Sequence, residues 1–314
     1  MSVLDWFRKN SAQFSGQIFL DEPLSKYTYY RIGGPADILA IPKNEEDLHW
    51  LAQGMSATGV SGFILGQGSN LLVSDRGFQG LVIRTGKLFL DLEICPGGEG
   101  EVGLKTGGSL PLSTLLKRAS LEGWSGLEFF AGIPGTVGGA VRMNAGTHLG
   151  EVAHALEKVE VRVLDEGSLN WKRLEFLEDQ LQFQYRKNLF LPKLCIVKSA
   201  EWKIQKTNPA EVKKAIDQVL ARRKASQPVD YPSCGSIFKN PKASGFLAWQ
   251  VIDRLGLRGY RMGNAQFSEK HSNFIINLGK AKATEVLGLI ELAKSRAQEE
   301  LGLTLEEEVI TLGF

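Results

Sequence analysis

The sequence predicts an α+β protein made of more than one lobe. Its 314 residues, 43% of them hydrophobic and 23% charged, suffice for a sizeable core in a soluble globular protein. Strand-like and helix-like patterns alternate in the first 80 residues, strand-like runs dominate to about residue 206, and helical patterns prevail after that. Two glycine-rich stretches, residues 66–70 and 129–146, follow apolar runs that anchor them. These observations indicate lobes with exposed backbone loops between buried elements.

Local patterns define the elements of the first 80 residues. Residues 1–26 mix aromatic and charged side chains, which predicts a short amphipathic leader packed on the body. A strand is expected at residues 38–41, followed by a helix that Asn44 caps and whose first turn is acidic. Residues 63–65 form the next short buried strand.

The middle of the chain is rich in predicted strands. Short apolar runs at residues 81–83, 88–90 and 102–104 begin a β-rich region. Pro111 stands in the first turn of a helix that ends near Gly123. Further strands are expected at residues 159–164, 169–174 and 194–204.

The pattern changes at Thr207, where we expect a domain boundary. Apolar positions at helical spacing mark helices near residues 212–220, 247–255 and 286–301, and residues 273–277 read as a strand. This is a compact α/β lobe. Residues 305–312 then read as a strand that pairs with an earlier part of the chain.

Charge and cysteine content exclude several classes of function. The net charge of +2 gives no general attraction to nucleic acid or membranes, and the basic run at residues 222–224 is typical of a solvated helix face. Cys95, Cys195 and Cys234 are too few and too scattered for a disulfide framework or a zinc cluster. No signal segment or membrane span is visible, so a cytoplasmic protein is expected.

The two glycine loops are the strongest chemical signal. Glycines at 132, 135, 138 and 139 permit φ > 0 and close approach of backbone N–H groups to an anion. Ser69 and Asn70 add side-chain donors in the shorter loop, and Asn144 adds an amide in the longer one. The pair suits the extended diphosphate of a dinucleotide, whereas a purely buried glycine turn is the alternative interpretation of the longer loop.

Other motifs are absent or misplaced. Residues 98–103 match G-x-G-x-x-G, but no helix pattern follows them and Glu99 and Glu101 would face the phosphates, so a β-turn is expected in place of a Rossmann site. The sequence has no P-loop, no H-E-x-x-H and no G-x-S-x-G, and its four histidines are scattered. No metal site is expected.

Several motifs together resemble the UDP-N-acetylenolpyruvoylglucosamine reductases of bacterial peptidoglycan synthesis, over nearly the whole chain. Three of them are shared loosely with other flavoproteins of the vanillyl-alcohol-oxidase-like fold: residues 30–37, residues 66–72 and residues 131–146. The more specific four are Tyr185-Arg186, residues 234–241, residues 270–277 and residues 305–309.

The resemblance implies a PCMH-type fold that holds FAD in two lobes, with a third lobe for the UDP-sugar substrate. The lobes would span residues 1–82 completed by 304–314, residues 83–206, and residues 207–303. NADPH would supply a hydride through FAD to the enolpyruvyl ether of UDP-N-acetylglucosamine, giving UDP-N-acetylmuramate. No nucleic acid or membrane partner is implied, and a monomer is expected.

The resemblance also carries residue roles. Arg186 matches the arginine that grips the substrate carboxylate, Ser236 the general acid, and Glu308 the carboxyl group that assists beside it. Lys224, Asn240 and His271 match substrate-contacting positions. The cofactor residues would be Tyr30, Arg31, Gly33, Gly66, Gly68, Ser69, Asn70, Gly132, Ile133, Pro134, Gly135, Val137, Gly138, Gly139, Asn144, Ala145 and Gly146.

Some positions depart from the family pattern. Asn188 stands where serine is frequent, and His148 stands where tyrosine is common. The short span from Arg186 to Ser236 resembles the subtype without an inserted tyrosine-bearing lid. Two rival functions stay open at this point: an oxidase or dehydrogenase of the same flavin fold acting on another alcohol or sugar, and a flavin- or nucleotide-sugar-binding protein without turnover.

Overall fold

The computed structural model describes residues 3–96, 101–165, 170–242 and 245–314. The chain forms two compact units, and it passes between them several times. The first unit comprises Met1–Leu20, Asp37–Gly66 and Gly80–Ala221, and the second comprises Asp21–Ala36, Gln67–Gln79 and Arg222–Phe314. The division into three lobes at residues 82, 206 and 303 stays a prediction.

The first unit contains two sheets. The smaller has the strand order β1-β2-β5-β3, and its strands β3 and β5 are parallel. Its strands are β1 (Gln17–Pro23), β2 (Pro35–Ile41), β3 (Gly62–Leu65) and β5 (Phe78–Arg84). Helices α1 (Val3–Asn10) and α2 (Glu45–Thr58) complete this part. Trp6 and Phe7 of α1 pack on Trp50 of α2, with ring centroids 4.9 and 5.3 Å from that ring, so the leader does pack on the body.

Helix α2 begins where the sequence predicts. Asn44 Oδ1 accepts a hydrogen bond from the Asp47 amide at 2.9 Å, which caps the first turn. At the other end Gly59 adopts φ 68° and donates its N–H to Met55 O at 2.8 Å.

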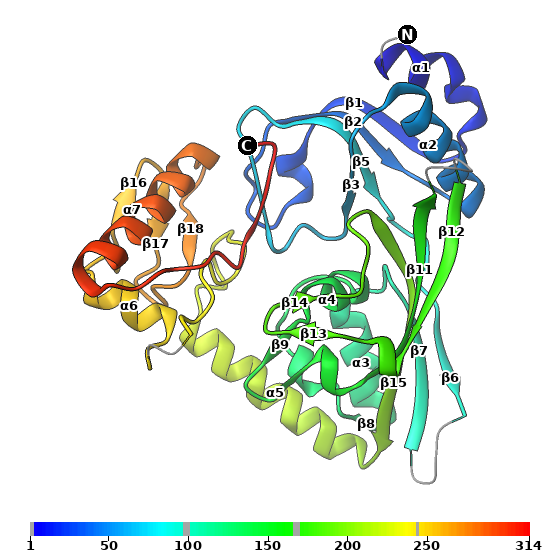
Figure 1. Cartoon of the computed structure of the whole chain (residues 1–314). Coiled ribbons are helices and arrows are strands. Elements are labelled where there is room, and N and C mark those ends of the chain that lie inside the picture. Colours follow the sequence, from blue (N-terminus) through cyan, green and yellow to red (C-terminus); the bar gives the residue numbers. More distant parts are fainter. Residues whose placement is uncertain (1–2, 97–100, 166–169, 243–244) are drawn as a thin grey trace. The chain divides into compact units, whose positions relative to one another are not determined.

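The larger sheet is antiparallel and has the order β12-β11-β15-β7-β6, with β8 also paired to β15. Its strands are β6 (Leu92–Cys95), β7 (Glu101–Gly107), β8 (Trp124–Ser125), β11 (Leu156–Asp165), β12 (Asn170–Leu177) and β15 (Cys195–Lys206). Figure 1 shows helices α3 (Leu112–Glu122) and α4 (Val137–Met143) on one face of this sheet. Trp124, Phe130 and Trp202 are buried there, and the Phe130 and Trp202 rings meet edge to face at 5.6 Å.

Short elements complete the first unit. Two small hairpins pair β9 (Gly146–Thr147) with β10 (Gly150–Glu151) and β13 (Phe183–Gln184) with β14 (Lys187–Asn188). Helix α5 (Pro209–Ser226) begins near the expected boundary and runs on past Ala221 into the second unit. Single 3₁₀ turns occur in this unit at Ser11–Gln13, Glu128–Phe130, Val152–His154 and Glu178–Gln180, and another, at Leu24–Tyr27, belongs to the second unit.

The second unit is built from three separate stretches of chain. Helix α7 (Ala283–Leu301) packs on the antiparallel sheet of β16 (Arg261–Met262), β17 (Ala265–Phe267) and β18 (Ile275–Asn277), next to α6 (Ala248–Arg254) (Figure 1). The last strand, β19 (Ile310–Leu312), pairs in parallel with β4 (Leu71–Val73). Tyr30, Ile32 and Leu72 enter the same buried core as α6 and α7.

Some expected elements differ. Residues 88–90 form no strand, and the strand of this region is β6 instead. The longer glycine stretch contains helix α4 and is not a continuous loop. The C-terminal strand is confirmed, but it covers only Ile310–Leu312 of the expected residues 305–312. Of residues 98–103, where a turn is expected, 98–100 lie outside the described residues and 101–103 belong to strand β7.

A membrane-spanning helix is not found in the described part of the chain, because no helix there combines sufficient length with sufficient hydrophobicity.

Candidate active site

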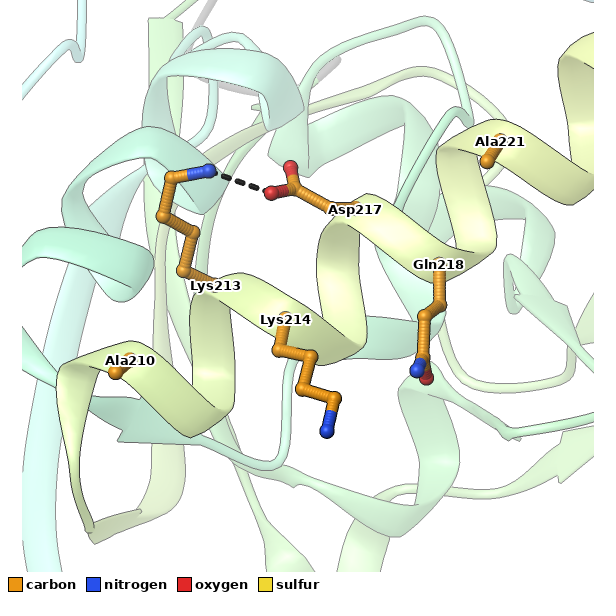
Figure 2. Close-up of a pocket in the computed structure, with 6 residues that line it drawn as sticks. All are labelled: Ala210, Lys213, Lys214, Asp217, Gln218 and Ala221. Carbon is orange, nitrogen blue, oxygen red and sulfur yellow. Dashed lines mark hydrogen bonds and ion pairs between the residues drawn. The ribbon is translucent and has the colours of Figure 1, made fainter.

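A hollow of about 460 Å3 lies along the exposed side of helix α5 in the first unit. Figure 2 shows its lining residues, which all come from this helix: Ala210, Lys213, Lys214, Asp217, Gln218 and Ala221. Lys213 pairs with Asp217 one turn later at 2.5 Å, an arrangement typical of a solvated helix face. The hollow includes no residue that the sequence assigns to cofactor or substrate, so the candidate site is built from the glycine loops and the catalytic segments.

The longer glycine loop surrounds the start of helix α4. The predicted cofactor residues lie before, within and after this helix. Those before it are Gly132, Ile133, Pro134 and Gly135, those within it are Val137, Gly138 and Gly139, and those after it are Asn144, Ala145 and Gly146. The Gly138 amide donates to Gly108 O at 2.7 Å, and a Cβ on Gly138 would lie 3.0 Å from that same oxygen. Gly138 therefore fastens the loop to the end of β7, and a side chain there would force its neighbours to shift.

The start of the shorter loop meets the longer one at Gly66. A Cβ at this position would lie 3.1 Å from Thr136 Oγ1, which is tighter than ordinary contact. Thr136 caps helix α4, since its Oγ1 accepts from the Gly139 amide at 3.3 Å. Bare backbone is thus kept open where the two loops meet, and such a cradle fits the diphosphate of a dinucleotide.

Arg186 lies at the tip of the hairpin formed by β13 and β14. Its φ of 58° is in the left-handed region, which non-glycine residues adopt rarely. The guanidinium carbon lies 5.0 Å from the centroid of the Tyr185 ring, a cation–π distance. Asn144, which is fully buried, donates its amide to Gln184 O in this hairpin at 3.1 Å.

The second unit brings the segments of Ser236 and Glu308 together. The Glu308 amide donates to Ile237 O at 2.7 Å, the Lys239 amide donates to Glu306 O at 2.8 Å, and Phe238 and Glu307 form an antiparallel bridge. Two residues separated by 72 positions in the printed sequence are therefore held on adjacent backbone segments.

The shorter glycine loop contacts the Glu308 segment. Asn70 donates its side-chain amide to Glu308 O at 2.9 Å, and the Ile310 amide donates to Asn70 O at 3.1 Å. Gly68 has φ 63°, and a Cβ on it would lie 2.5 Å from Tyr27 O, so this position requires glycine. Ser69 lies between Gly68 and Asn70.

Tyr30 and Cys234 are buried near the Ser236 segment in the second unit. Burial, and secondarily Cys234, raises the pKa of the Tyr30 hydroxyl, which has no hydrogen-bond partner within the described ranges. Burial also raises the pKa of the Cys234 thiol far above its ordinary value, and the nearby Glu308 carboxylate adds to this effect. The thiol is therefore protonated at neutral pH. Arg31, next to Tyr30, is exposed with φ 55°, and Gly33 follows with φ 139°.

The three predicted substrate residues all belong to the second unit. Lys224 is exposed and its carbonyl accepts from Lys270 Nζ at 2.5 Å. Asn240 Oδ1 accepts from the Ala248 amide at 3.0 Å, at the start of α6. Burial lowers the pKa of His271, whose Nδ1 has no partner in the part of the chain that the structure describes. A neutral imidazole of this kind can donate or accept one hydrogen bond.

Asn273 is a supporting residue that the sequence analysis did not single out. Its Oδ1 accepts from the Phe238 amide at 3.0 Å, its Nδ2 donates to Phe238 O at 2.8 Å, and its own carbonyl accepts from the Ile237 amide at 2.8 Å. It thus holds the segment that follows Ser236. Its place within the specific motif at residues 270–277 was the available signal.

Two family models match the chain. A FAD binding domain matches residues 36–170, and the C-terminal domain of UDP-N-acetylenolpyruvoylglucosamine reductase matches residues 227–312. The first range contains both glycine loops, and the second contains Ser236 and Glu308. The match to a FAD binding domain, together with the solved structure below, confirms the predicted α+β flavoprotein fold and FAD as cofactor.

Relatives align over almost their whole length. UDP-N-acetylenolpyruvoylglucosamine reductase 1 of a Bacillus cereus strain is 38% identical over 95% of this chain and 95% of its own. The enzyme of Heliobacterium modesticaldum is also 38% identical, over 96% of this chain and 92% of its own. The crystal structure of the Thermus caldophilus reductase superposes with a TM-score of 0.76 at 37% identity, covering 95% of this chain and 99% of that one. The chain therefore belongs to the UDP-N-acetylenolpyruvoylglucosamine reductase family and is an oxidoreductase with a FAD-binding domain.

Proposed function

We propose that the protein reduces UDP-N-acetylglucosamine enolpyruvate to UDP-N-acetylmuramate, a step of peptidoglycan precursor synthesis, with NADPH as the hydride donor. The observation that carries this proposal is the pairing of the Ser236 and Glu308 segments in the second unit, in a chain that aligns with reductases of this name over 95% of its length. FAD, once bound and reduced by NADPH, would supply the hydride that the enolpyruvyl methylene carbon accepts.

Each of three residues has a distinct task in this proposal. Arg186 holds the substrate carboxylate through two parallel hydrogen bonds and balances the negative charge that develops beside it. Ser236 donates its hydroxyl proton to the carbon next to that carboxylate, and Glu308 assists the proton transfer. The backbone that follows Ser236 is held by Asn273 and by the Glu308 segment, which supports a fixed position for the serine backbone.

The proposal also assigns the cofactor and substrate contacts. We propose that backbone of residues 66–70 and 132–139 cradles the FAD diphosphate, and that Lys224, Asn240 and His271 contact the substrate. We also propose that the protein is a monomer and that it works in the cytoplasm. The three cysteines are free thiols, which is the state that a reducing compartment maintains.

The test uses the purified protein as isolated. Its absorption spectrum should show a flavin, and heat or acid should release all of the colour, because FAD is held without a covalent bond. Beyond the one equivalent that reduces the bound flavin, NADPH should then be consumed only when UDP-N-acetylglucosamine enolpyruvate is present, at similar rates with and without oxygen. Rapid oxygen-dependent consumption without that substrate would favour an oxidase, and no consumption under either condition would favour a binding protein without turnover.

A further inference from the structure

The hairpin that carries Arg186 is tied to the end of helix α4 by two asparagine side chains. Asn144, which ends the helix, donates its amide to Gln184 O on β13 at 3.1 Å. Asn188 on β14 donates its amide in the opposite direction, to Arg142 O. The two ties lie on the two strands that flank the Tyr185–Arg186 tip, so both strands are anchored at the base of the tip.

Asn144 is committed to this structural contact at both ends of its amide. Besides donating to Gln184 O, it accepts at Oδ1 from the Ala153 amide at 3.0 Å, and the residue is fully buried. Its φ of 45° is a left-handed conformation that asparagine and aspartate tolerate better than other side chains. The side chain therefore has its partners inside the protein, although the sequence pattern assigns it to the cofactor.

The left-handed conformation of Arg186 needs such support. A non-glycine residue in this region of φ is strained unless the surrounding structure holds it in place. The two strands of the hairpin are only two residues long, so the hairpin alone gives little support. Because Gln184 and Lys187 pair directly across the tip, a shift of Gln184 displaces Arg186.

We propose that Asn144 is a positioning residue for Arg186, which rests on the role of Arg186 in the proposed function. The same residue ends the helix that Thr136 begins in the glycine loop, so one seven-residue helix links the cofactor loop to the hairpin. Through this link the arginine keeps a fixed place relative to the loop during the reaction.

The test is a double-mutant cycle read in two half-reactions. Asn144→Asp removes the donor to Gln184, keeps the acceptor for Ala153 and tolerates the left-handed backbone. Stopped-flow mixing measures bleaching of the flavin by NADPH, and then its return when the enolpyruvyl substrate is added. We expect Asn144→Asp to slow the second step about 10–100-fold while leaving the first near normal, since a displacement of about 1 Å is costly to a positioned group. In an Arg186→Ala background, Asn144→Asp should slow the second step by a further factor of less than about 3.

The matched control is Asn277→Asp in the second unit. Asn277 is also buried, donates its amide to a backbone carbonyl, that of Tyr30, at 3.0 Å, and accepts from the Gly279 and Ala281 amides. The fold-change that Asn277→Asp causes in the rate of flavin re-oxidation, whatever its size, should be the same with and without Arg186→Ala. If Asn144→Asp does not fold, Asn144→Gly, which keeps the backbone conformation, and Asn188→Asp complete the same cycle.

The outcomes separate this inference from the proposed function. The positioning role would be overturned if Asn144→Asp slowed both half-reactions equally or caused loss of bound FAD. It would also be overturned if Asn144→Asp slowed re-oxidation by the same fold-change in the Arg186→Ala background as in the parent. Failure of the unmodified protein to re-oxidise with the enolpyruvyl substrate would instead refute the proposed function. A normal second half-reaction in Arg186→Ala alone would remove the role of Arg186 and this inference with it.

Discussion

Ser236 follows a glycine with φ 84° and precedes two residues whose amides are bonded to Asn273. Its backbone is therefore fixed without help from its own side chain. We expect Ser236→Ala to leave reduction by NADPH near its normal rate and to slow re-oxidation by the enolpyruvyl substrate about 10²–10⁴-fold, because the hydroxyl acts only after hydride transfer. Stopped-flow absorbance of the flavin measures both steps.

The control for this prediction is Cys234→Ala, two residues away. The thiol is buried next to a glycine turn, where a small thiol contributes to packing, so the change should be mild. A defect confined to re-oxidation in Cys234→Ala, or equal slowing of both steps in Ser236→Ala, would take the assigned role from the serine.

Glu308 differs from its two acidic neighbours in its surroundings. Glu306 pairs with Lys239 at 3.4 Å and Glu307 pairs with Lys294 at 3.0 Å, whereas Glu308 lies close enough to the buried Cys234 to affect its pKa. We expect Glu308→Gln to retain FAD and its reduction while slowing re-oxidation. Glu306→Gln and Glu307→Gln should have near-normal kinetics in the same assay, and a larger defect in either would show that the wrong glutamate had been chosen.

At the level of single residues, the sequence names the catalytic candidates but not their supports. The motif containing Ser236 and the motif containing Glu308 are far apart in the chain, and no local pattern reveals that they pair. Asn70 and Asn144 illustrate the limit. An amide in a glycine loop predicts a ligand donor, yet its partner is chosen by tertiary packing, and the structure gives both amides a backbone carbonyl.

Helix α4 shows why one element was missed. Its first turn contains Gly138 and Gly139, which disfavour a helix by roughly 1 kcal/mol each relative to alanine, so the sequence reads as a loop. The Thr136 cap and the burial of Val137, Ala140 and Val141 against the large sheet outweigh that preference. By contrast, α2 was predicted from its Asn44 cap and apolar spacing, and α3 from the proline at its start, its apolar spacing and its terminal glycine.

Two salt bridges connect the first turn of α2 to the large sheet. Glu45 accepts from Arg162 of β11 at 2.7 Å and from Lys198 of β15 at 2.9 Å. Partial burial alone would raise the pKa of Glu45, but the hydrogen bonds from these two cations outweigh it and the pKa is lowered. Since the folded pKa lies below the unfolded one, the pair stabilises the fold above the ordinary value of 4.5, and this contribution is lost as the pH falls through the folded pKa.

We therefore expect Glu45→Gln to reduce the acid sensitivity of the fold. Urea midpoints measured from pH 7 down to about pH 3.5 should fall less steeply in this variant than in the parent, and the two should differ most at neutral pH. Glu46→Gln, in the same helical turn, is the matched control and should follow the parent. Parallel curves for Glu45→Gln and the parent would show that the ion pairs do not stabilise the folded state.

On the scale of the whole molecule, the second unit depends on two early stretches of the chain. Its buried core includes Tyr30, Ile32 and Leu72 together with residues of α6 and α7. We expect residues 222–314 expressed alone to lack a cooperative unfolding transition, because strand β19 has no partner and this core is incomplete without them. The unfolding transition is measured by far-UV circular dichroism at increasing urea concentration, with the full chain as control. A sharp transition in the fragment would show that the C-terminal part folds independently.

The pairing of β4 with β19 also has a consequence for the order in which the molecule is made. Asn70 and Glu308, which this pairing brings together, are separated by 238 positions. At about 5–20 residues per second, a ribosome needs roughly 10–50 s to reach the second partner after the first. During that interval Leu71–Val73 has been synthesised without its parallel neighbour, so the glycine loop before it cannot take its final form until Ile310–Leu312 have been synthesised. Nascent chains arrested just before Ile310 would contain every predicted cofactor residue, yet lack the strand that pairs with β4 after the shorter loop.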